Sequence, residues 1–338
     1  MSYLVLARKY RPKKFSEVQG QFHIVKTLQN AVKNNQIAHA YIFAGPRGVG
    51  KTSVARIFAK VLNCLNRKGT EPCLKCDQCT TIDRGVNLAV SEIDGASHNS
   101  VENVRDLIES FRAVPAGKSK YKVYIIDEVH MLTSAAFNAL LKSLEEPPPN
   151  TVFILATTEP HKIIPTVTSR CQTFDFKKLS VDIIFSELQK IARLEKIPFE
   201  EKALKLISRL AEGSLRDAQS LLDRVRAFCE DKITSEQAAK ALGVASDELL
   251  GELVLNIFKG QPDKAMQLVN EIISEGYDIT VFLKQFADIL RWSSEIRFNA
   301  SKEDLFSQEL KTAIKDQIMK IPENNFMDLI FEGLYGAD

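Results

Sequence analysis

The sequence has no apolar run that approaches the roughly 20 residues needed to cross a membrane. It also lacks a secretory leader, because the charged residues of the first eleven positions are not followed by an apolar stretch and a cleavage site. Its net charge is only +2, so the bulk charge neither indicates nor excludes nucleic-acid binding. Internal repeats and low-complexity segments are missing as well. These absences exclude membrane-spanning, secreted and repeat proteins, and we expect a cytoplasmic protein.

The hydrophobic pattern predicts an α/β fold followed by an all-helical half. At 338 residues the chain is long enough for two or three domains. Four apolar segments read as buried strands: 39–44, 88–93, 121–126 and 151–156. Segments of helical periodicity accompany them: 22–33, 53–63, 101–111 and 134–145. Such alternation predicts a parallel sheet covered on both faces, and after Lys178 only amphipathic helices are expected.

Residues 45–52 have the pattern G-x-x-x-x-G-K-[ST], which is typical of a phosphate-binding loop. The predicted strand before it and the helix after it would aim backbone N–H groups and a helix N-terminus at one polyphosphate. We assign Lys51 to the β- and γ-phosphates and the Thr52 hydroxyl to Mg²⁺. The predicted nucleotide-binding residues of this loop are Gly45, Pro46, Arg47, Gly48, Val49, Gly50, Lys51, Thr52 and Ser53.

An acidic pair, Asp127-Glu128, directly follows the third predicted strand. In nucleotide triphosphatases an acid at such a strand end helps to hold Mg²⁺, and a neighbouring carboxylate can activate the attacking water. We assign Asp127 to the metal and Glu128 to the water. Thr157 and Thr158 end the fourth strand, where a polar side chain could contact the γ-phosphate or the attacking water.

A polar insert at about 64–87 carries four cysteines with the spacing C-x8-C-x2-C-x2-C: Cys64, Cys73, Cys76 and Cys79. Four thiolates complete a closed tetrahedral Zn²⁺ site, which is a structural site with no open position for catalysis. An iron–sulfur cluster also takes four thiolates, and free thiols are a third interpretation. The charged and amide neighbours fit an exposed zinc knuckle better. Cys171 and Cys229 lie apart from the cluster, and we interpret both as packing residues.

Two arginines lie at positions from which they could contact a nucleotide. Arg170 follows the fourth strand at the far side of the expected sheet, so it could serve only a neighbouring subunit, as an arginine finger. Arg216 lies in the first turn of a predicted helix, where a nearby polyphosphate would offset the unfavourable helix dipole. The ordinary interpretations are a salt bridge for Arg170 and a solvated side chain for Arg216. The five histidines are scattered, and we assign none of them to catalysis.

The phosphate loop, the Asp127-Glu128 strand end, Ser169-Arg170-Cys171 and Arg216 occur in an order that resembles AAA+ ATPases of the clamp-loader group. The cysteine insert after the phosphate-loop helix narrows the resemblance to the ATPase subunits of the bacterial DNA polymerase III clamp loader. The N-terminal residues 6–12, with Phe15 and residues 18–21 after them, also resemble those of these ATPase subunits. The resemblance covers about residues 1–242, and only a helical block matches beyond Gly243.

The resemblance implies the fold and further site residues. The fold would be an AAA+ phosphate-loop domain at 1–178 with a zinc-binding insert, a helical lid at 179–242 and an all-α oligomerisation collar at 243–338 that continues past Asp338. Arg170 would be the finger in trans, Thr157, or less preferably Thr158, would be sensor 1, and Arg216 would be sensor 2. The residues near the adenine and ribose would be Ala7, Arg8, Tyr10, Arg11 and Pro12.

The implied function is an ATP hydrolase that uses ATP, Mg²⁺ and a structural Zn²⁺ and loads a sliding clamp onto primed DNA during replication. Its partners would be δ- and δ′-type clamp-loader subunits, further copies of itself, the sliding clamp and primed DNA, with no membrane partner. Polymerase core and helicase would be reached only through a C-terminal tail outside this sequence. Arg105, on the predicted helix at 101–111, would be a DNA contact.

Two alternatives stay open at this point. A helicase or branch-migration motor of the AAA+ class would share the phosphate loop, Asp127-Glu128 and Arg216, but it would not explain the cysteine insert or Ser169-Arg170-Cys171. A clamp-loader relative that binds partners without hydrolysis would lack a working phosphate loop, whereas Lys51 and Thr52 are present here.

Overall fold

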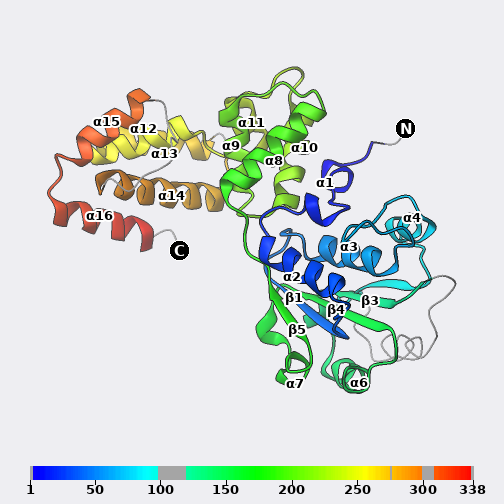
Figure 1. Ribbon diagram of the computed structural model, residues 1–338. Helices are drawn as coiled ribbons and strands as arrows, with labels where there is room; N and C mark the ends of the chain where they lie inside the picture. The colour runs from blue at the N-terminus through cyan, green and yellow to red at the C-terminus, as the bar shows by residue number, and fades with distance from the viewer. Residues whose placement is uncertain (1–2, 98–118, 275, 299–307, 336–338) are drawn as a thin grey trace. The chain divides into compact units, whose positions relative to one another are not determined.

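Five parallel strands form the centre of the first half of the chain (Figure 1). The computed structural model describes residues 3–97, 119–274, 276–298 and 308–335. Along the sheet the strands follow the order β2-β3-β4-β1-β5, and all four neighbouring pairs are parallel. Their bounds are β1 Ala40–Ala44, β2 Val90–Asp94, β3 Lys122–Asp127, β4 Thr151–Thr157 and β5 Gln172–Asp175. The order puts the carboxyl end of β1 beside that of β4, with Ala44 opposite Thr157.

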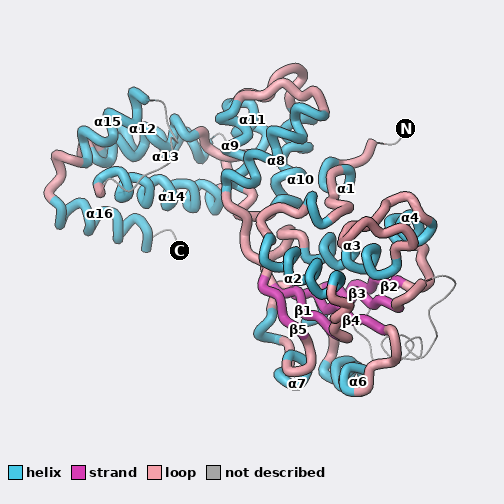
Figure 2. Tube along the Cα trace, viewed as in Figure 1, coloured by secondary structure: helices cyan, strands magenta, loops and turns pink. Residues whose placement is uncertain are grey.

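Helices cover both faces of this sheet, with α2 and α3 on one side and α6 and α7 on the other (Figure 2). The pleat of β1 decides which residues meet each layer. Tyr41 and Phe43 pack with the α2 and α3 side, where the Tyr41 ring meets Phe58 edge-on at 5.3 Å between centroids. Ile42 points the opposite way and packs with Leu140 of α6. Side chains of β1 therefore enter the apolar core on both faces of the sheet. Such a strand is apolar throughout, as expected for a buried parallel sheet.

The helices that accompany the sheet are mostly where their periodicity predicted them. Helices α2 and α6 have the predicted bounds, and the predicted helix after the phosphate loop begins two residues earlier than expected, at Lys51. In the described part of this half the α-helices are α1 Leu6–Lys9, α2 Phe22–Lys33, α3 Lys51–Asn63, α4 Asp77–Arg84, α6 Ser134–Glu145 and α7 Pro165–Thr168. Three short 3₁₀ helices join them: η1 Phe15–Glu17, η2 Val129–Met131 and η3 Pro160–Lys162.

The strand β5 and the helix α4 were not predicted. Of the four residues of β5 only Phe174 is buried. This edge strand therefore lacks the apolar alternation from which a strand can be predicted. Helix α4 lies inside the cysteine insert, which was predicted as a polar insert without assigned secondary structure. The predicted helix at 101–111, together with Arg105, lies outside the described residues.

The chain divides into two compact units. One unit comprises Met1–Ile191 and Ser208–Ser220, and the other comprises Ala192–Ile207 and Leu221–Asp338. Three helices have residues in both: α8 Val181–Leu194, α9 Glu201–Leu210 and α10 Leu215–Phe228. The start of α10, with Arg216, thus clusters with the sheet, as do most of α8 and the end of α9.

The second unit consists of helices in its described part, as predicted. Its remaining helices are α11 Ser235–Leu242, α12 Asp247–Phe258, α13 Pro262–Ser274, α14 Ile279–Arg297, α15 Gln308–Ile318 and α16 Glu323–Tyr335. Its core includes Phe258, Trp292 and Phe326, all of them buried. Among the described residues, no helix combines the length and the apolar character that a membrane crossing requires.

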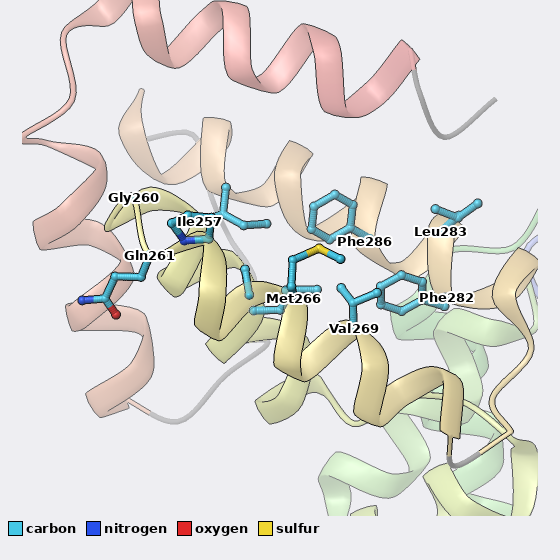
Figure 3. A pocket seen from close by; sticks show the side chains of 11 residues that line it. Ile257, Gly260, Gln261, Met266, Val269, Phe282, Leu283 and Phe286 are labelled. Atoms are coloured by element: carbon cyan, nitrogen blue, oxygen red, sulfur yellow. The ribbon is translucent and has the colours of Figure 1, made fainter.

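An apolar groove lies among α12, α13 and α14 of this unit (Figure 3). Its volume is about 370 Å³, and the ring of Phe282 stacks on that of Phe286 in its wall, with centroids 6.2 Å apart. Met266 lines the groove and is 57% exposed. The groove thus offers solvent an apolar surface of the kind that monomeric proteins usually cover.

Candidate nucleotide-binding site

The phosphate loop connects the end of β1 to the start of α3, which confirms the predicted strand, loop and helix. Its position relative to the sheet is set by the N–H of Gly45, which donates to the carbonyl of Thr157 at 3.1 Å. Gly50 is the N-cap of α3 with φ of 105°, a conformation that glycine adopts easily and other residues avoid. Gly48 faces Ser214 so closely that a Cβ atom would lie 1.8 Å from its hydroxyl oxygen. A glycine is therefore required at both positions.

Lys51 and Thr52, the first two residues of α3, form side-chain hydrogen bonds to the phosphate loop and to the end of β3. Lys51 is 5% exposed, and its ammonium donates to the carbonyls of Gly45 at 2.6 Å and Pro46 at 2.8 Å. Burial lowers the pKa of Lys51, and the nearby carboxylates of Glu128 and Asp127 oppose that shift. The Thr52 hydroxyl donates to Asp127 Oδ2 at 2.7 Å, across 75 residues of sequence. The structure thus brings together the two residues that were assigned to Mg²⁺.

Glu128 adopts a backbone conformation that is rare for a residue with a side chain. Its φ of 46° and ψ of 45° are left-handed, which costs about 1–3 kcal/mol for such a residue. Gly95, just after β2, lies against it, since a Cβ on Gly95 would be 2.7 Å from the Glu128 carbonyl oxygen. The Glu128 carboxylate accepts a hydrogen bond from the Thr158 hydroxyl at 2.9 Å. Strain of this kind is typical of residues that a functional site holds in place.

The two neighbouring threonines have different surroundings. Thr157 is completely buried, and its hydroxyl oxygen lies 3.0 Å from Nδ1 of His130 and accepts the N–H of Glu159 at 3.0 Å. The His130 ring lies among carboxylates, with Nδ1 3.4 Å from Glu128 and Nε2 3.2 Å from Glu159. Thr158 contacts Glu128 directly, whereas Thr157 reaches it only through His130. The two threonines thus differ in their contact with Glu128, and the choice of sensor between them stays a prediction.

One cavity joins the phosphate loop to the N-terminal segment and to the start of α10. All of residues 47–53 line it, together with Asp127 and Glu128. The N-terminal segment contributes Ala7, Arg11, Pro12, Val18 and Gln19, and the remaining wall is made by Leu179, Leu215, Arg216 and Gln219. Of the residues predicted near the adenine and ribose, Arg8 and Tyr10 are absent from this lining, and Arg8 is exposed.

Several lining residues were missed by the sequence reasoning. Gln219 follows Arg216 by three positions on α10, so helical spacing could have placed it on the same face. Gln19 and Leu179 carried no such signal, because they reach the cavity only through the tertiary fold.

Positive charge gathers in this cavity. Burial lowers the pKa of Arg11, the neighbouring charges of Arg56 and Arg216 lower it further, and Glu92 and Asp127 oppose them. A buried cation next to other cations is destabilising unless an anion neutralises it. The cavity is therefore suited to a polyphosphate.

Arg170 lies outside this cavity, at the end of α7. Its guanidinium donates to the carbonyl of Thr166 at 2.7 Å and forms an ion pair with Glu145 at 2.8 Å. The side chain is 35% exposed and that of Glu145 is 50% exposed, so the pair is of the weak, solvated kind. The ordinary interpretation of Arg170, a salt bridge, is thus present within the chain.

The four insert cysteines lie together, with all sulfur atoms within 4.8 Å of one another. Around a tetrahedral Zn²⁺ with Zn–S bonds of about 2.3 Å, neighbouring sulfurs are about 3.8 Å apart, so a small contraction would suffice. Cys73 donates its N–H to Cys64 Sγ at 3.2 Å, and the backbone N–H of Lys75 contributes most to lowering the pKa of Cys73 to about 6. Burial raises the pKa of Cys79. The sulfur arrangement and the N–H donors fit a closed tetrathiolate site.

The two remaining cysteines lie apart from the insert cluster. Cys171 packs against the core on the α6 side of the sheet, and burial raises its pKa to about 12. Burial also raises the pKa of Cys229. Neither thiol is activated.

Solved structures with this arrangement include the Thermotoga maritima RuvB Holliday junction branch migration motor. The likeness has a TM-score of 0.53 at 21% identity and covers 73% of this chain and 79% of that one. At such identity it concerns the fold alone. The fold and the phosphate loop together define a phosphate-loop protein of the AAA+ class.

Family models and similar proteins identify the family of this chain within that class. Three models match in succession: "DNA polymerase III, delta subunit" over 20–180, "DNA polymerase III clamp loader subunit, ATPase lid domain" over 183–231, and "DNA polymerase III subunits gamma and tau domain III" over 233–332. DNA polymerase III subunit tau of Bacillus subtilis is 42% identical over 322 residues, which are 94% of this chain and 57% of that protein. The tau subunit of Escherichia coli is 42% identical over 313 residues, 92% of this chain and 48% of that one.

The gamma subunit of Buchnera aphidicola from Schizaphis graminum is 39% identical over 325 residues, which are 96% of this chain and 88% of that protein. The chain belongs to the gamma/tau family of DNA polymerase III subunits. It spans about half the length of the tau subunits and most of the gamma subunit. This result confirms the resemblance seen in the sequence and separates the chain from branch-migration motors, which share only its fold.

Proposed function

We propose that this chain is the ATPase motor subunit of a bacterial DNA polymerase III clamp loader, which uses ATP binding and hydrolysis to load a sliding clamp onto primed DNA. One observation carries the proposal: the Thr52 hydroxyl meets Asp127 at 2.7 Å in a cavity that also contains Lys51, Glu128 and Arg216. These are the parts of a phosphate-loop hydrolase, in a chain about 40% identical to gamma and tau subunits.

In this proposal each residue of the cavity has one task. Lys51 and the backbone N–H groups of the phosphate loop, other than that of Pro46, which has none, bind the β- and γ-phosphates, and Arg216 binds them from the start of α10. Thr52 and Asp127 hold Mg²⁺, which neutralises charge on the phosphate oxygens. Glu128 orients the attacking water and accepts its proton. Thr158 acts as the sensor at the end of β4, because its hydroxyl already contacts Glu128 at 2.9 Å.

Residues of the N-terminal segment would bind the adenine and ribose. Ala7, Arg11 and Pro12 keep this role, because they line the cavity. Arg8 and Tyr10 are absent from this lining, and their assignment to the adenine and ribose stays a prediction.

Arg170 is proposed to act on the nucleotide of a neighbouring subunit. It lies outside the cavity of its own chain, and its solvated pair with Glu145 contributes at most about 1 kcal/mol. Exchanging Glu145 for the phosphate oxygens of a neighbour's ATP would therefore cost little. A cation that arrives only when subunits are aligned makes hydrolysis depend on assembly.

We also propose one structural Zn²⁺, held by Cys64, Cys73, Cys76 and Cys79 within a domain at 1–178. Residues 179–242 form the lid and residues 243–338 the oligomerisation collar. The change of family model near 180 supports the first of these boundaries, whereas the second model change, between 231 and 233, lies about ten residues before the proposed one. The compact units cut the chain elsewhere, because residues 208–220 pack with the sheet domain and bring Arg216 to the phosphate loop.

The proposed partners are δ- and δ′-type clamp-loader subunits, further copies of this chain, the sliding clamp and primed DNA. For the apolar groove among α12, α13 and α14 we propose the collar domain of a neighbouring clamp-loader subunit as occupant. The half-exposed Met266 and the match of this region to domain III of gamma and tau support that choice. We also propose that the protein works in the bacterial cytoplasm, because a clamp loader acts on the chromosome.

The test is steady-state ATP hydrolysis by this chain with δ- and δ′-type subunits, with and without sliding clamp and primed DNA. We expect strong stimulation by clamp and DNA, its loss in Arg170→Ala, and no loss in Arg84→Ala, an exposed arginine of the insert. ATP binding by the isolated Arg170→Ala chain should be unchanged, since Arg170 lies outside the cavity. Turnover that ignores clamp and DNA would contradict the proposal.

A further inference from the structure

One carboxylate connects the cysteine insert to the wall of the nucleotide cavity. Glu71 lies between Cys64 and Cys73, and its two oxygens accept the backbone N–H groups of Phe15 and Ser16, each at 2.9 Å. These contacts bridge 56 and 55 residues of sequence. Phe15 and Ser16 are the first two residues of η1, whose N–H groups have no partner within the helix. A carboxylate that receives two N–H groups there is a charge-assisted cap, which is stronger than a neutral one.

The capped helix η1 lies in the middle of a segment that lines the cavity. Arg11 and Pro12 line it just before η1, and Val18 and Gln19 line it just after. The bonds made inside the segment are local, such as the N–H of Lys13 to Glu17 at 2.7 Å. For residues 12–18, the hydrogen bonds to other segments in the described chain all go to Glu71. The side chain of Phe15, 1% exposed, anchors the segment in the core.

Glu71 is itself held by the insert. It closes a turn with Lys68, in which the two residues exchange backbone hydrogen bonds of 3.2 Å and 3.0 Å. The loop that carries this turn begins at Cys64 and ends at Cys73, so two of the four thiolates define its ends. A metal ion in the cluster would hold these ends together, and the position of the Glu71 carboxylate would depend on it.

We propose that the cysteine insert positions the nucleotide-binding wall. Through Glu71 the metal-closed loop holds residues 11–18 against the cavity, so that ATP affinity depends on the cluster although no cysteine touches the nucleotide. This inference rests on the proposed ATP site. Glu71 is a positioning residue, because it acts through η1 and not on the ligand.

The first arm of the test compares ATP dissociation constants of the full chain. We expect Glu71→Ala to weaken ATP binding about tenfold, because two charge-assisted hydrogen bonds hold the wall. Glu71→Gln should lie between Glu71→Ala and the parent chain, because one amide oxygen still accepts an N–H. Asp77→Asn is the matched control, since Asp77 is an exposed acid of the same insert, and it should bind as the parent does.

Further measurements distinguish positioning from a loss of fold. Zinc content should stay at the parent level in both Glu71 variants, and kcat at saturating ATP should change less than twofold while KM rises. Amide hydrogen exchange at Phe15 and Ser16 should accelerate in Glu71→Ala even before nucleotide is added. A purely structural cap would lower the melting temperature without moving the dissociation constant, and that result would overturn the inference.

The second arm removes the metal. Stripping zinc from the parent chain with a chelator should weaken ATP binding by about the same factor as Glu71→Ala, and adding Zn²⁺ back should restore it. Stripping zinc from Glu71→Ala should have no further effect. An equal additional loss in both proteins would mean that the metal acts by another route, and the inference would be wrong. If the parent chain binds no ATP, the proposed function itself fails.

Discussion

A buried ion pair anchors the cysteine insert to the phosphate-loop helix, and its removal gives a sharp stability test. Lys60 on α3 donates to Asp83 on α4 at 2.7 Å, and the Lys60 side chain is only 2% exposed. Asp83→Asn keeps the size of the acid but removes its charge. The change leaves the Lys60 ammonium in the protein interior without a counterion.

The magnitude follows from the surroundings of the two groups. Removing one member of a fully buried pair costs about 3–5 kcal/mol, because the other charge stays desolvated. The Asp83 side chain is 34% exposed, so water reaches one side of the pair and the cost should fall to about 2–3 kcal/mol. For a domain of 150–250 residues each kcal/mol lowers the melting temperature by about 2–4 °C. We therefore expect a decrease of about 4–12 °C for the unit that contains the sheet.

The chain provides its own reporter for the assay. Its one tryptophan, Trp292, is 3% exposed in the core of the other unit, so its fluorescence follows the unfolding of that unit. Circular dichroism follows both units. In Asp83→Asn the transition seen only by circular dichroism should move, while the Trp292 transition should stay in place.

The control is the double variant Lys60→Met with Asp83→Asn, which removes the buried charge together with its partner. It should recover stability to within about 1 kcal/mol of the parent, because an apolar side chain of similar length needs no counterion. A decrease below about 1 °C in the single variant, or a double variant as unstable as the single one, would refute the reasoning.

Three further predictions concern the site. Glu128→Gln should bind ATP as the parent does but hydrolyse it about a hundredfold more slowly in a steady-state assay, and unchanged turnover would remove Glu128 from its role. Thr158→Val should reduce turnover more than Thr157→Val, because only Thr158 contacts Glu128 directly; the reverse order would restore Thr157 as the sensor. Cys76→Ser should lose its metal in elemental analysis, and a brown, iron-containing parent protein would show that the cluster is not a zinc site.

Local features of the site could be predicted because each is encoded within a few consecutive residues. The glycines and Lys51-Thr52 of the phosphate loop follow one apolar strand, and Asp127 and Glu128 follow another. In a parallel sheet such strand ends meet at one edge, so the sequence already implied the contact of Thr52 with Asp127. The cysteine cluster could also be predicted from the sequence, since its spacing brings four thiolates within reach of one ion.

Other features depend on which segments the fold places side by side. The edge strand β5 was missed, because it is mostly exposed and is held as a strand by pairing with β1. Thr157 and Thr158 are chemically equivalent in the sequence, and only the fold brings Thr158, the residue after the end of β4, into contact with Glu128. Arg8 and Tyr10 were placed at the nucleotide by resemblance, and the geometry leaves them outside the cavity.

The sequence by itself therefore determined the class of the protein, its phosphate loop, its acidic pair and its cysteine cluster. Such features are short-range: a strand, a tight loop or a pair of closely spaced ligands is decided by neighbouring residues. The tertiary structure alone decided that Gln19 and Leu179 line the nucleotide cavity, and that Glu71 caps η1 across more than fifty residues. Such contacts are long-range, and a single polar residue in a loop carries no sign of the partner that the packed core will bring to it.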